Sequence, residues 1–249
     1  MNESTKFWAV IPAAGIGSRM ASDIPKQYLN IAGKTILEHT LAIFLNSPKI
    51  HKVVVAIRPD DPFWQNTAIT STASEKLVTV TGGGERADSV LNCLSYIQSL
   101  GNNNKDWVLV HDAARPCLQV SELHRMIDAL QTDDVGGLMA LPASDTIKYA
   151  KLPQTVSSDQ NAETTNFACI ETTLDRKRVW LAQTPQMFRL EVLHNNIAKA
   201  LALGLPITDE ASAMEMAGFN VKLYPGRSDN LKITVAEDLR VATAILSQS

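Results

Sequence analysis

Short apolar runs alternate along the chain with segments whose apolar residues recur every three or four positions. Runs of the first kind are typical of buried strands, and they cover residues Phe7–Ile11, Lys52–Ile57, Leu77–Thr81, Trp107–Val110 and Gly137–Leu141. Segments of the second kind are typical of helices, and they cover residues Ile36–Leu45, Asp88–Leu100 and Ser121–Leu130. This alternation predicts an α/β fold in which right-handed crossovers join a mainly parallel, twisted sheet with helices on both faces.

A sheet of this kind binds its ligands at one edge, beyond the carboxyl ends of the parallel strands. We therefore expect the loops that follow Ile11, Thr81, Val110 and Leu141 to converge on one side of the molecule.

Residues 143–182 break the alternation. Their middle is polar and rich in turn residues, while the flanking segments D-T-I-K-Y-A and F-A-C-I-E-T-T-L could pair as the two strands of a hairpin. The pattern predicts a projecting β-arm. Because an isolated hairpin is only marginally stable in water, such an arm needs a surface to lie on, and a second copy of the chain could supply it.

The remaining residues return to the α/β pattern. Helical spacing covers Arg189–Leu203, a second helix is expected to begin with Thr208 as its N-cap, a strand covers Val221–Tyr224, and a last helix covers Ala236–Leu246. With no internal repeat, the chain is expected to be a single domain, residues 1–249, that carries residues 143–182 as a dimerisation arm.

Composition narrows the class of protein. The 249 residues are 45% hydrophobic, which is ample for one packed core, and the net charge of −3 comes without any run of basic residues. Nucleic acid and membrane are therefore not expected as partners. Three widely spaced cysteines form no C-x-x-C pair, and the first residues lack the pattern of an export signal, so a reducing, cytoplasmic location is expected.

The first predicted strand runs into a loop that combines glycines with basic residues. Gly15 and Gly17 let backbone N–H groups approach a phosphate chain, and Arg19 and Lys26 add positive charge beside it. This combination predicts nucleotide chemistry. A dinucleotide-binding loop is disfavoured because G-I-G-S-R-M lacks the third glycine of that motif. The remaining alternative is that both charges are simply solvated near a turn.

Two further loops carry candidate site residues. Gly82-Gly83-Gly84 follows one strand and could lie flat against a pyrimidine, or could be a tight turn without a ligand. Asp112 ends another strand, where a carboxylate can hold Mg²⁺ or a ribose hydroxyl, and Arg115 could receive a phosphate or pair with Asp112 as a loop staple. His111 is interpreted as structural, because no second histidine lies at ligand spacing.

Seven motifs occur in an order that resembles one family. They are P-A-A-G-I-G-S-R-M with P-K-Q-Y, G-G-G-E-R-A-D-S-V, V-H-D-A-A-R-P, D-T-I-K, T-P-Q, T-D-E-A-S-A and D-N-L-K-I-T, spread from residue 8 to about residue 240. Together they resemble the 2-C-methyl-D-erythritol 4-phosphate cytidylyltransferases. The resemblance implies a Rossmann-like nucleotidyltransferase fold, the substrates CTP and a polyol phosphate, the cofactor Mg²⁺, and a homodimer whose arms contribute to the partner's site.

The resemblance also implies a role for individual residues. It makes Arg19, Lys26 and Lys232 the catalytic cations. It assigns nucleotide binding to Pro12, Ala13, Ala14, Gly15, Gly17, Gly83, Gly84, Ala87, Ser89, Asp112 and Ala113. It assigns acceptor binding to Arg115, Asp145, Thr146, Arg176, Thr184 and Thr208, with Arg178 an alternative to Arg176 and with a turn or a helix cap as the alternative for the last two. No residue is assigned as a dedicated metal ligand.

Two other functions stay open from the sequence. A cytidylyltransferase for another polyol phosphate, such as ribitol 5-phosphate, would have the same nucleotide half of the site. A non-catalytic nucleotide-sensing module would keep the glycine loop but turn nothing over, although binding alone does not require cations gathered at the α-phosphate.

Overall fold

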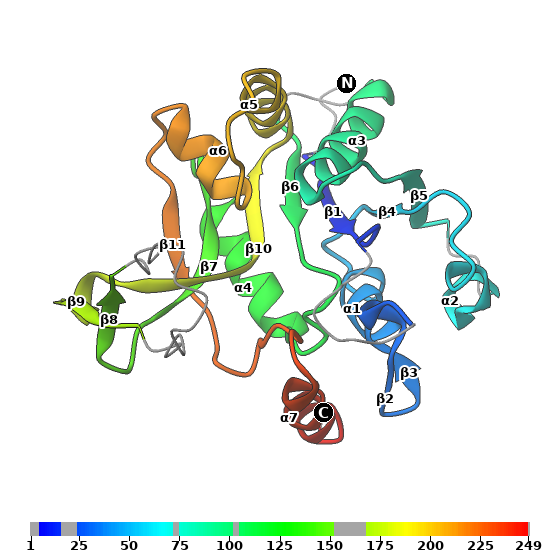
Figure 1. Cartoon of the computed structure of the whole chain (residues 1–249). Helices are drawn as coiled ribbons and strands as arrows, with labels where there is room; N and C mark the ends of the chain where they lie inside the picture. The colour runs from blue at the N-terminus through cyan, green and yellow to red at the C-terminus, as the bar shows by residue number, and fades with distance from the viewer. Residues whose placement is uncertain (1–4, 16–23, 72–74, 102–104, 152–167, 249) are drawn as a thin grey trace, which may run out of the picture.

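A seven-stranded sheet forms the centre of the molecule (Figure 1). The computed structural model describes residues 5–15, 24–71, 75–101, 105–151 and 168–248. In spatial order the strands are β11 (Lys222–Pro225), β7 (Gly136–Pro142), β10 (Trp180–Arg189), β6 (Trp107–Val110), β1 (Phe7–Pro12), β4 (Lys52–Ile57) and β5 (Leu77–Thr81). Only β10 runs antiparallel to its neighbours in this sheet, so the predicted α/β fold with a mainly parallel sheet is confirmed.

Helices cover both faces of the sheet because successive side chains of each buried strand point to opposite sides. Ala9 and Ile11 of β1 pack toward α1 (Ile36–Leu45) and α4 (Val120–Leu130), whereas Trp8 and Val10 pack toward the other face. That face is covered by α3 (Arg86–Ser99), α5 (Leu190–Ala202) and α6 (Glu210–Met216). The continuous apolar runs of the strands are thus explained by burial on two sides.

Smaller elements complete the described chain. They are the short strands β2 (Asn30–Ile31) and β3 (Lys34–Thr35), the helices α2 (Ala68–Ser71) and α7 (Ala236–Leu246), and the 3₁₀ turns η2 (Lys26–Tyr28), η3 (Trp64–Asn66) and η4 (Arg176–Arg178). Helix α7 and the segment before it pack Ile233 and Ala242 against Ile31 and Ile36, which holds the C-terminal segment beside η2. No helix of the described residues is long and apolar enough to cross a membrane.

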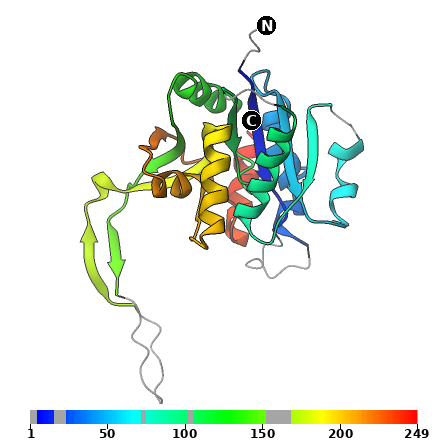
Figure 2. The same ribbon diagram turned by 90° about the horizontal axis from the view of Figure 1, so that it is seen from above.

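The hairpin of the predicted arm projects from the body of the molecule (Figure 2). Its strands β8 (Ile147–Ala150) and β9 (Ile170–Leu174) pair antiparallel, as expected, while residues 152–167 lie outside the described chain. The arm is shorter at its end than predicted. Trp180 and Leu181 already pair with Pro142 and Leu141, so residues 180–182 belong to the main sheet.

Three other expectations require correction. The strand Trp180–Arg189 was not predicted; its apolar pattern is interrupted by Pro185, which lies where the pairing with β7 shifts register. Strand β5 lies at the edge of the sheet and is only half-buried. The cap of α6 is Asp209 and not Thr208, because the Asp209 carboxylate accepts the backbone N–H of Ser212 at 2.9 Å.

Candidate active site

Three of the four loops expected to converge form the walls of one pocket of about 280 Å³ at the carboxyl edge of the sheet. They follow β1, β5 and β6, and the fourth loop, after β7, leads instead into the arm. Two lysines complete the pocket, Lys26 from η2 and Lys232 from the segment after β11. The lining residues are Pro12, Ala13, Ala14, Gly15, Lys26, Gln27, Gly83, Gly84, Glu85, Arg86, Ser89, Asp112, Ala113, Ala114 and Lys232.

The glycine segment after β5 allows two loops and a helix to meet closely. A Cβ on Gly82 would lie 2.3 Å from the Cβ of Ala14, and one on Gly83 would lie 2.2 Å from the Cβ of Asp88. The backbone N–H of Gly83 donates to the Ser89 hydroxyl at 3.0 Å, and that hydroxyl donates to the carbonyl of Glu85 at 3.2 Å. Ser89 therefore ties the glycine segment to the first turn of α3.

Gln27 fixes the other wall of the pocket. Its side-chain amide donates to the carbonyls of Ala13 and Gly15, each at 2.9 Å, so the 3₁₀ turn that carries Lys26 is joined to the loop after β1. The Lys26 ammonium donates to the carbonyl of Ile233 at 3.1 Å. The two lysines of the pocket are thus linked through the chain that neighbours Lys232.

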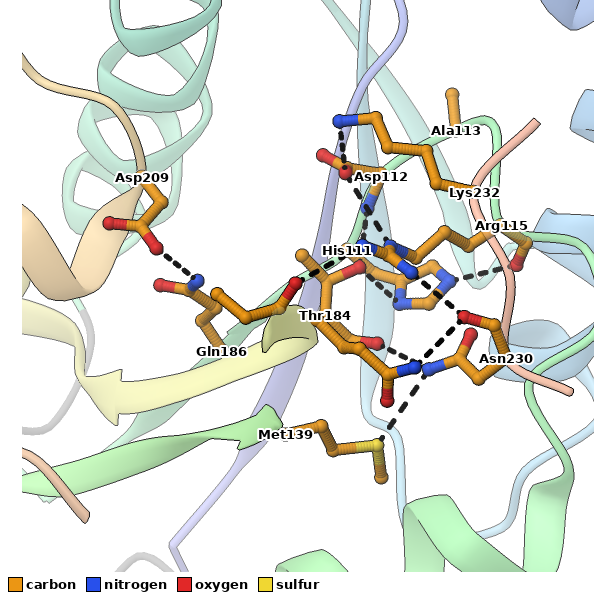
Figure 3. Close-up of polar contacts among 12 residues, drawn as sticks. His111, Asp112, Ala113, Arg115, Met139, Thr184, Gln186, Asp209, Asn230 and Lys232 are labelled. Carbon is orange, nitrogen blue, oxygen red and sulfur yellow. Dashed lines mark hydrogen bonds and ion pairs between the residues drawn. The ribbon is translucent and has the colours of Figure 1, made fainter. Parts of the chain in front are cut away.

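Asp112 has three cationic neighbours among the described residues, of which Figure 3 shows Lys232 and Arg115. Its Oδ1 accepts Arg86 Nε at 3.1 Å, its Oδ2 lies 2.8 Å from Lys232 Nζ, and Arg115 Nε lies 3.7 Å from Oδ2. Burial would raise the pKa of Asp112, but the nearby cations, Arg86 and Lys232 foremost, outweigh it and hold the pKa well below its usual range. Asp112 is therefore ionised at neutral pH.

His111 fixes the backbone of Asp112. It is fully buried, and burial lowers the pKa of His111 to about 4, so the ring is neutral at pH 7 and carries one N–H. Nε2 lies 3.0 Å from the carbonyl of Arg115, which can only accept, so Nε2 carries the proton and Nδ1 accepts the hydroxyl of Thr184 at 3.0 Å. The Thr184 oxygen in turn accepts the Asp112 N–H at 3.1 Å. The structural interpretation of His111 fits this arrangement.

Arg115 and Asn230 hold the segment that carries Lys232 (Figure 3). The Arg115 guanidinium donates to the carbonyls of Asn230 at 2.8 Å and Ala182 at 3.4 Å, and the Asn230 amide donates to the carbonyl of Thr184 at 2.8 Å. Arg115 is 8% exposed, so in this conformation it acts within the protein. Its contact with Asp112 fits the alternative named in the sequence analysis, in which the two residues pair with each other to hold the loop.

A sequence profile of the 2-C-methyl-D-erythritol 4-phosphate cytidylyltransferase family matches residues 7–248. The chain belongs to this family. It is 52% identical over 233 residues to the 2-C-methyl-D-erythritol 4-phosphate cytidylyltransferase of Pseudomonas aeruginosa strain UCBPP-PA14, a match that covers 94% of this chain and 93% of that relative.

Solved structures of cytidylyltransferases share the fold. That of the Francisella tularensis 2-C-methyl-D-erythritol 4-phosphate cytidylyltransferase has a TM-score of 0.77 at 36% identity, covering 97% of this chain and all of that one (100%). A 4-diphosphocytidyl-2C-methyl-D-erythritol synthase has a TM-score of 0.79 at 34% identity, covering 98% of this chain and 100% of the other.

The pocket brings together most of the residues that the cytidylyltransferase resemblance implied. Predicted site residues that do not line it are Ala87, Arg115, Asp145, Thr146, Arg176, Thr184 and Thr208. Ala87 is buried in the first turn of α3, and Asp145, Thr146 and Arg176 are exposed at the base of the arm. Gly17 and Arg19 lie outside the described residues.

Four residues that line the pocket were not predicted as site residues: Gln27, Glu85, Arg86 and Ala114. Gln27 and Arg86 both stand inside motifs that were recognised, P-K-Q-Y and G-G-G-E-R-A-D-S-V. Their position next to Lys26 and the glycine segment was a signal for a role, but their partners are set by the fold.

Proposed function

We propose that this pocket transfers CMP from CTP to 2-C-methyl-D-erythritol 4-phosphate. A phosphate oxygen of the acceptor attacks the α-phosphorus of CTP, the new P–O bond forms as the bond to the β-phosphate oxygen breaks, and pyrophosphate leaves. The observation that carries this proposal is the convergence of Lys26, Lys232 and Asp112 on a glycine-lined pocket in a chain of this family.

The chemistry requires positioning and charge stabilisation without a covalent nucleophile. Lys26 and Lys232 enter the pocket from opposite ends of the chain and supply point charges for the triphosphate and for the charge that develops at the α-phosphorus. Arg19, by family resemblance, adds a forked guanidinium to the same task. Gly83 and Gly84 line the pocket, and we propose that their backbone groups hydrogen-bond the edge of the cytosine ring.

The residues present fit a magnesium ion carried by the nucleotide. Mg²⁺ is usually held by one or two carboxylates together with substrate phosphates and water. Asp112 places a carboxylate in the pocket wall, and its oxygens keep lone pairs beyond those that face Arg86 and Lys232. Asp112 would thus hold the ion while the triphosphate supplies further oxygens. A bound Mg²⁺ would neutralise phosphate charge and orient the leaving pyrophosphate.

The acceptor site is proposed to be shared between two copies of the chain. Asp145, Thr146 and Arg176 are exposed at the base of the arm and do not line the pocket of their own chain. The arm projects from the body, so a second copy could receive these groups beside its own pocket (Figure 2). Thr146 and Arg176 would then bind the acceptor's phosphate in the partner's site.

Pyrophosphate release tests this function directly. The assay contains CTP, Mg²⁺ and either 2-C-methyl-D-erythritol 4-phosphate or ribitol 5-phosphate, with ATP, GTP and UTP as controls. Release with CTP and the methylerythritol phosphate alone is the expected result. Release only with ribitol 5-phosphate would overturn the acceptor and keep the chemistry, and CTP binding without release would favour a nucleotide-sensing module.

A further inference from the structure

Arg86 lines the pocket, yet its positive charge is already engaged on the side away from it. Nη1 and Nη2 donate to the two carboxylate oxygens of Glu210 at 2.7 and 3.1 Å. The Glu210 side chain is 1% exposed and does not line the pocket. Arg86 Nε then donates to Asp112 Oδ1 at 3.1 Å. One guanidinium therefore joins a buried carboxylate on α6 to the carboxylate in the pocket wall.

The planar guanidinium makes this join directional. A bidentate pair with Glu210 fixes the plane of the Arg86 head group, and this fixes the direction in which Nε points. Because Nε occupies Oδ1 of Asp112, the other oxygen, Oδ2, faces Lys232 at 2.8 Å. A lysine in place of Arg86 would supply a charge but could not bridge the two carboxylates.

We propose that Arg86 is a positioning residue for the reaction, anchored by Glu210 so that it orients the Asp112 carboxylate toward Lys232 and the nucleotide. This inference rests on the proposed function and gives a role to the motif T-D-E-A-S-A, residues 208–213. Within this motif Asp209 caps α6, and Glu210, which does not line the pocket, acts through Arg86. Removing either member of the Arg86–Glu210 pair should misplace Asp112.

The first test separates positioning from phosphate binding. In Arg86→Lys and in Glu210→Gln, kcat should fall about 10- to 100-fold, since a misplacement of about one ångström in an active site has effects of that size. The KM and the dissociation constant for CTP should stay within about threefold of the parent values. If Arg86 bound phosphate instead, Arg86→Lys would largely keep kcat, Arg86→Gln would weaken CTP binding tenfold or more, and Glu210→Gln would leave turnover unchanged.

A second test separates positioning from folding stability. The double variant Arg86→Met with Glu210→Gln removes both charges, and replacing a buried ion pair by neutral groups is often nearly neutral for stability. We expect its unfolding temperature to recover toward that of the parent while kcat stays low. If the unfolding temperature and kcat both recovered, the Arg86–Glu210 pair would only stabilise the fold. Arg125→Lys and Glu122→Gln, which alter an ion pair on α4 away from the pocket, are the matched controls and should keep kcat.

A crystal structure of Glu210→Gln supplies a result that does not depend on turnover. Asp112 should leave its contact with Lys232 or rotate about its side chain. If the parent protein fails to turn over CTP while Asp112 moves in this variant, the proposed function is wrong and the positioning role stands. If Asp112 keeps both of its contacts in the variant, the positioning role is wrong whatever the activity.

Discussion

At the scale of single residues, two lysines bring positive charge into the pocket. Lys26 is held by the carbonyl of Ile233 and Lys232 by Asp112, so both ammonium groups are placed before the nucleotide arrives. Charge that is already in position costs little reorganisation when the transition state forms, which is the condition under which it accelerates a reaction most.

Lys26→Ala is therefore expected to lower kcat at least a hundredfold, and Arg19→Ala likewise, if one lost transition-state contact is worth about 3 kcal/mol. Steady-state pyrophosphate release measures the effect. Lys49→Ala, which removes a surface partner of Asp128, serves as the control and should match the parent. Activity of the Lys26 or Arg19 variant within tenfold of the parent would contradict the assigned role.

His111 links the site to the pH dependence of stability. Its pKa is about 4 in the folded protein and near 6.5 when unfolded, so the unfolded chain binds more protons between these values. The free energy of unfolding therefore falls as pH falls from about 6.5 toward 4. At pH 4.5 the proton uptake of His111 in the unfolded chain destabilises the protein by about 2 kcal/mol relative to pH 7.

His111→Gln should flatten this dependence, because glutamine can donate to the carbonyl of Arg115 but cannot take up a proton. Urea unfolding at pH 7 and pH 4.5 measures the difference. The variant should be less stable than the parent at pH 7, yet lose about 2 kcal/mol less on acidification. His194→Gln, on α5, should lose as much as the parent. Equal losses in the parent and in His111→Gln would rule out the neutral buried histidine.

At the scale of elements, the site depends on how closely the glycine segment after β5 approaches its neighbours. A methyl group on Gly83 would meet the Cβ of Asp88 at 2.2 Å, whereas one on Gly84 meets only a carboxylate oxygen of Asp88 at 3.7 Å. Adjacent glycines thus provide a matched pair of substitutions.

Gly83→Ala should displace the start of α3 and destabilise the protein by about 1–3 kcal/mol, with a parallel loss of CTP affinity. Gly84→Ala should leave the free energy of unfolding within about 0.5 kcal/mol of the parent. Denaturant unfolding and calorimetric titration with CTP measure both effects. If Gly83→Ala kept the stability of the parent while Gly84→Ala lost stability, the glycine segment would be packed differently from this structure.

Elements whose apolar pattern is continuous could be predicted almost to the residue. The strands Lys52–Ile57 and Trp107–Val110 and the helix Ile36–Leu45 have the predicted bounds, because each buries an uninterrupted face. Strand Trp180–Arg189 escaped prediction because it owes its state to pairing with β6 and β7, which lie far from it in the sequence. Pro185 lies inside this strand, and a proline in a sequence is more typical of a turn than of a central strand.

The same distinction holds for the site. Lys26, Asp112 and Lys232 stand in motifs that could be interpreted from their chemistry, and the pocket contains them. The pairing of Arg86 with Glu210 joins residues 124 positions apart, so no local pattern contains it. Arg115 and Thr184 show what a local pattern leaves out: their partners within the protein, such as the carbonyl of Asn230 and the ring of His111, are set by the fold.

At the scale of the whole molecule, the arm projects away from the body of its own chain (Figure 2). Its hairpin exposes Tyr149, Ile170 and Leu174, at 55%, 59% and 38% of their accessible surface. Exposed apolar side chains on a projecting hairpin are typical of an interaction surface, and an isolated two-stranded hairpin is at best marginally stable in water. The dimer proposed above would cover these side chains and bring Thr146 and Arg176 of one chain toward the pocket of the other.

We therefore expect a dimer in sedimentation velocity at micromolar concentration, and Ile170→Glu should shift it toward monomer by placing a charge among the covered side chains. The monomer should bind CTP as the parent does, because the nucleotide pocket lies within one chain. Its turnover should fall at least tenfold, since the acceptor would lose the partner's Thr146 and Arg176. Val241→Glu, at a similarly exposed apolar position on α7, is the control and should remain dimeric and active. A monomeric Ile170→Glu variant with full turnover would mean that each chain completes its own acceptor site.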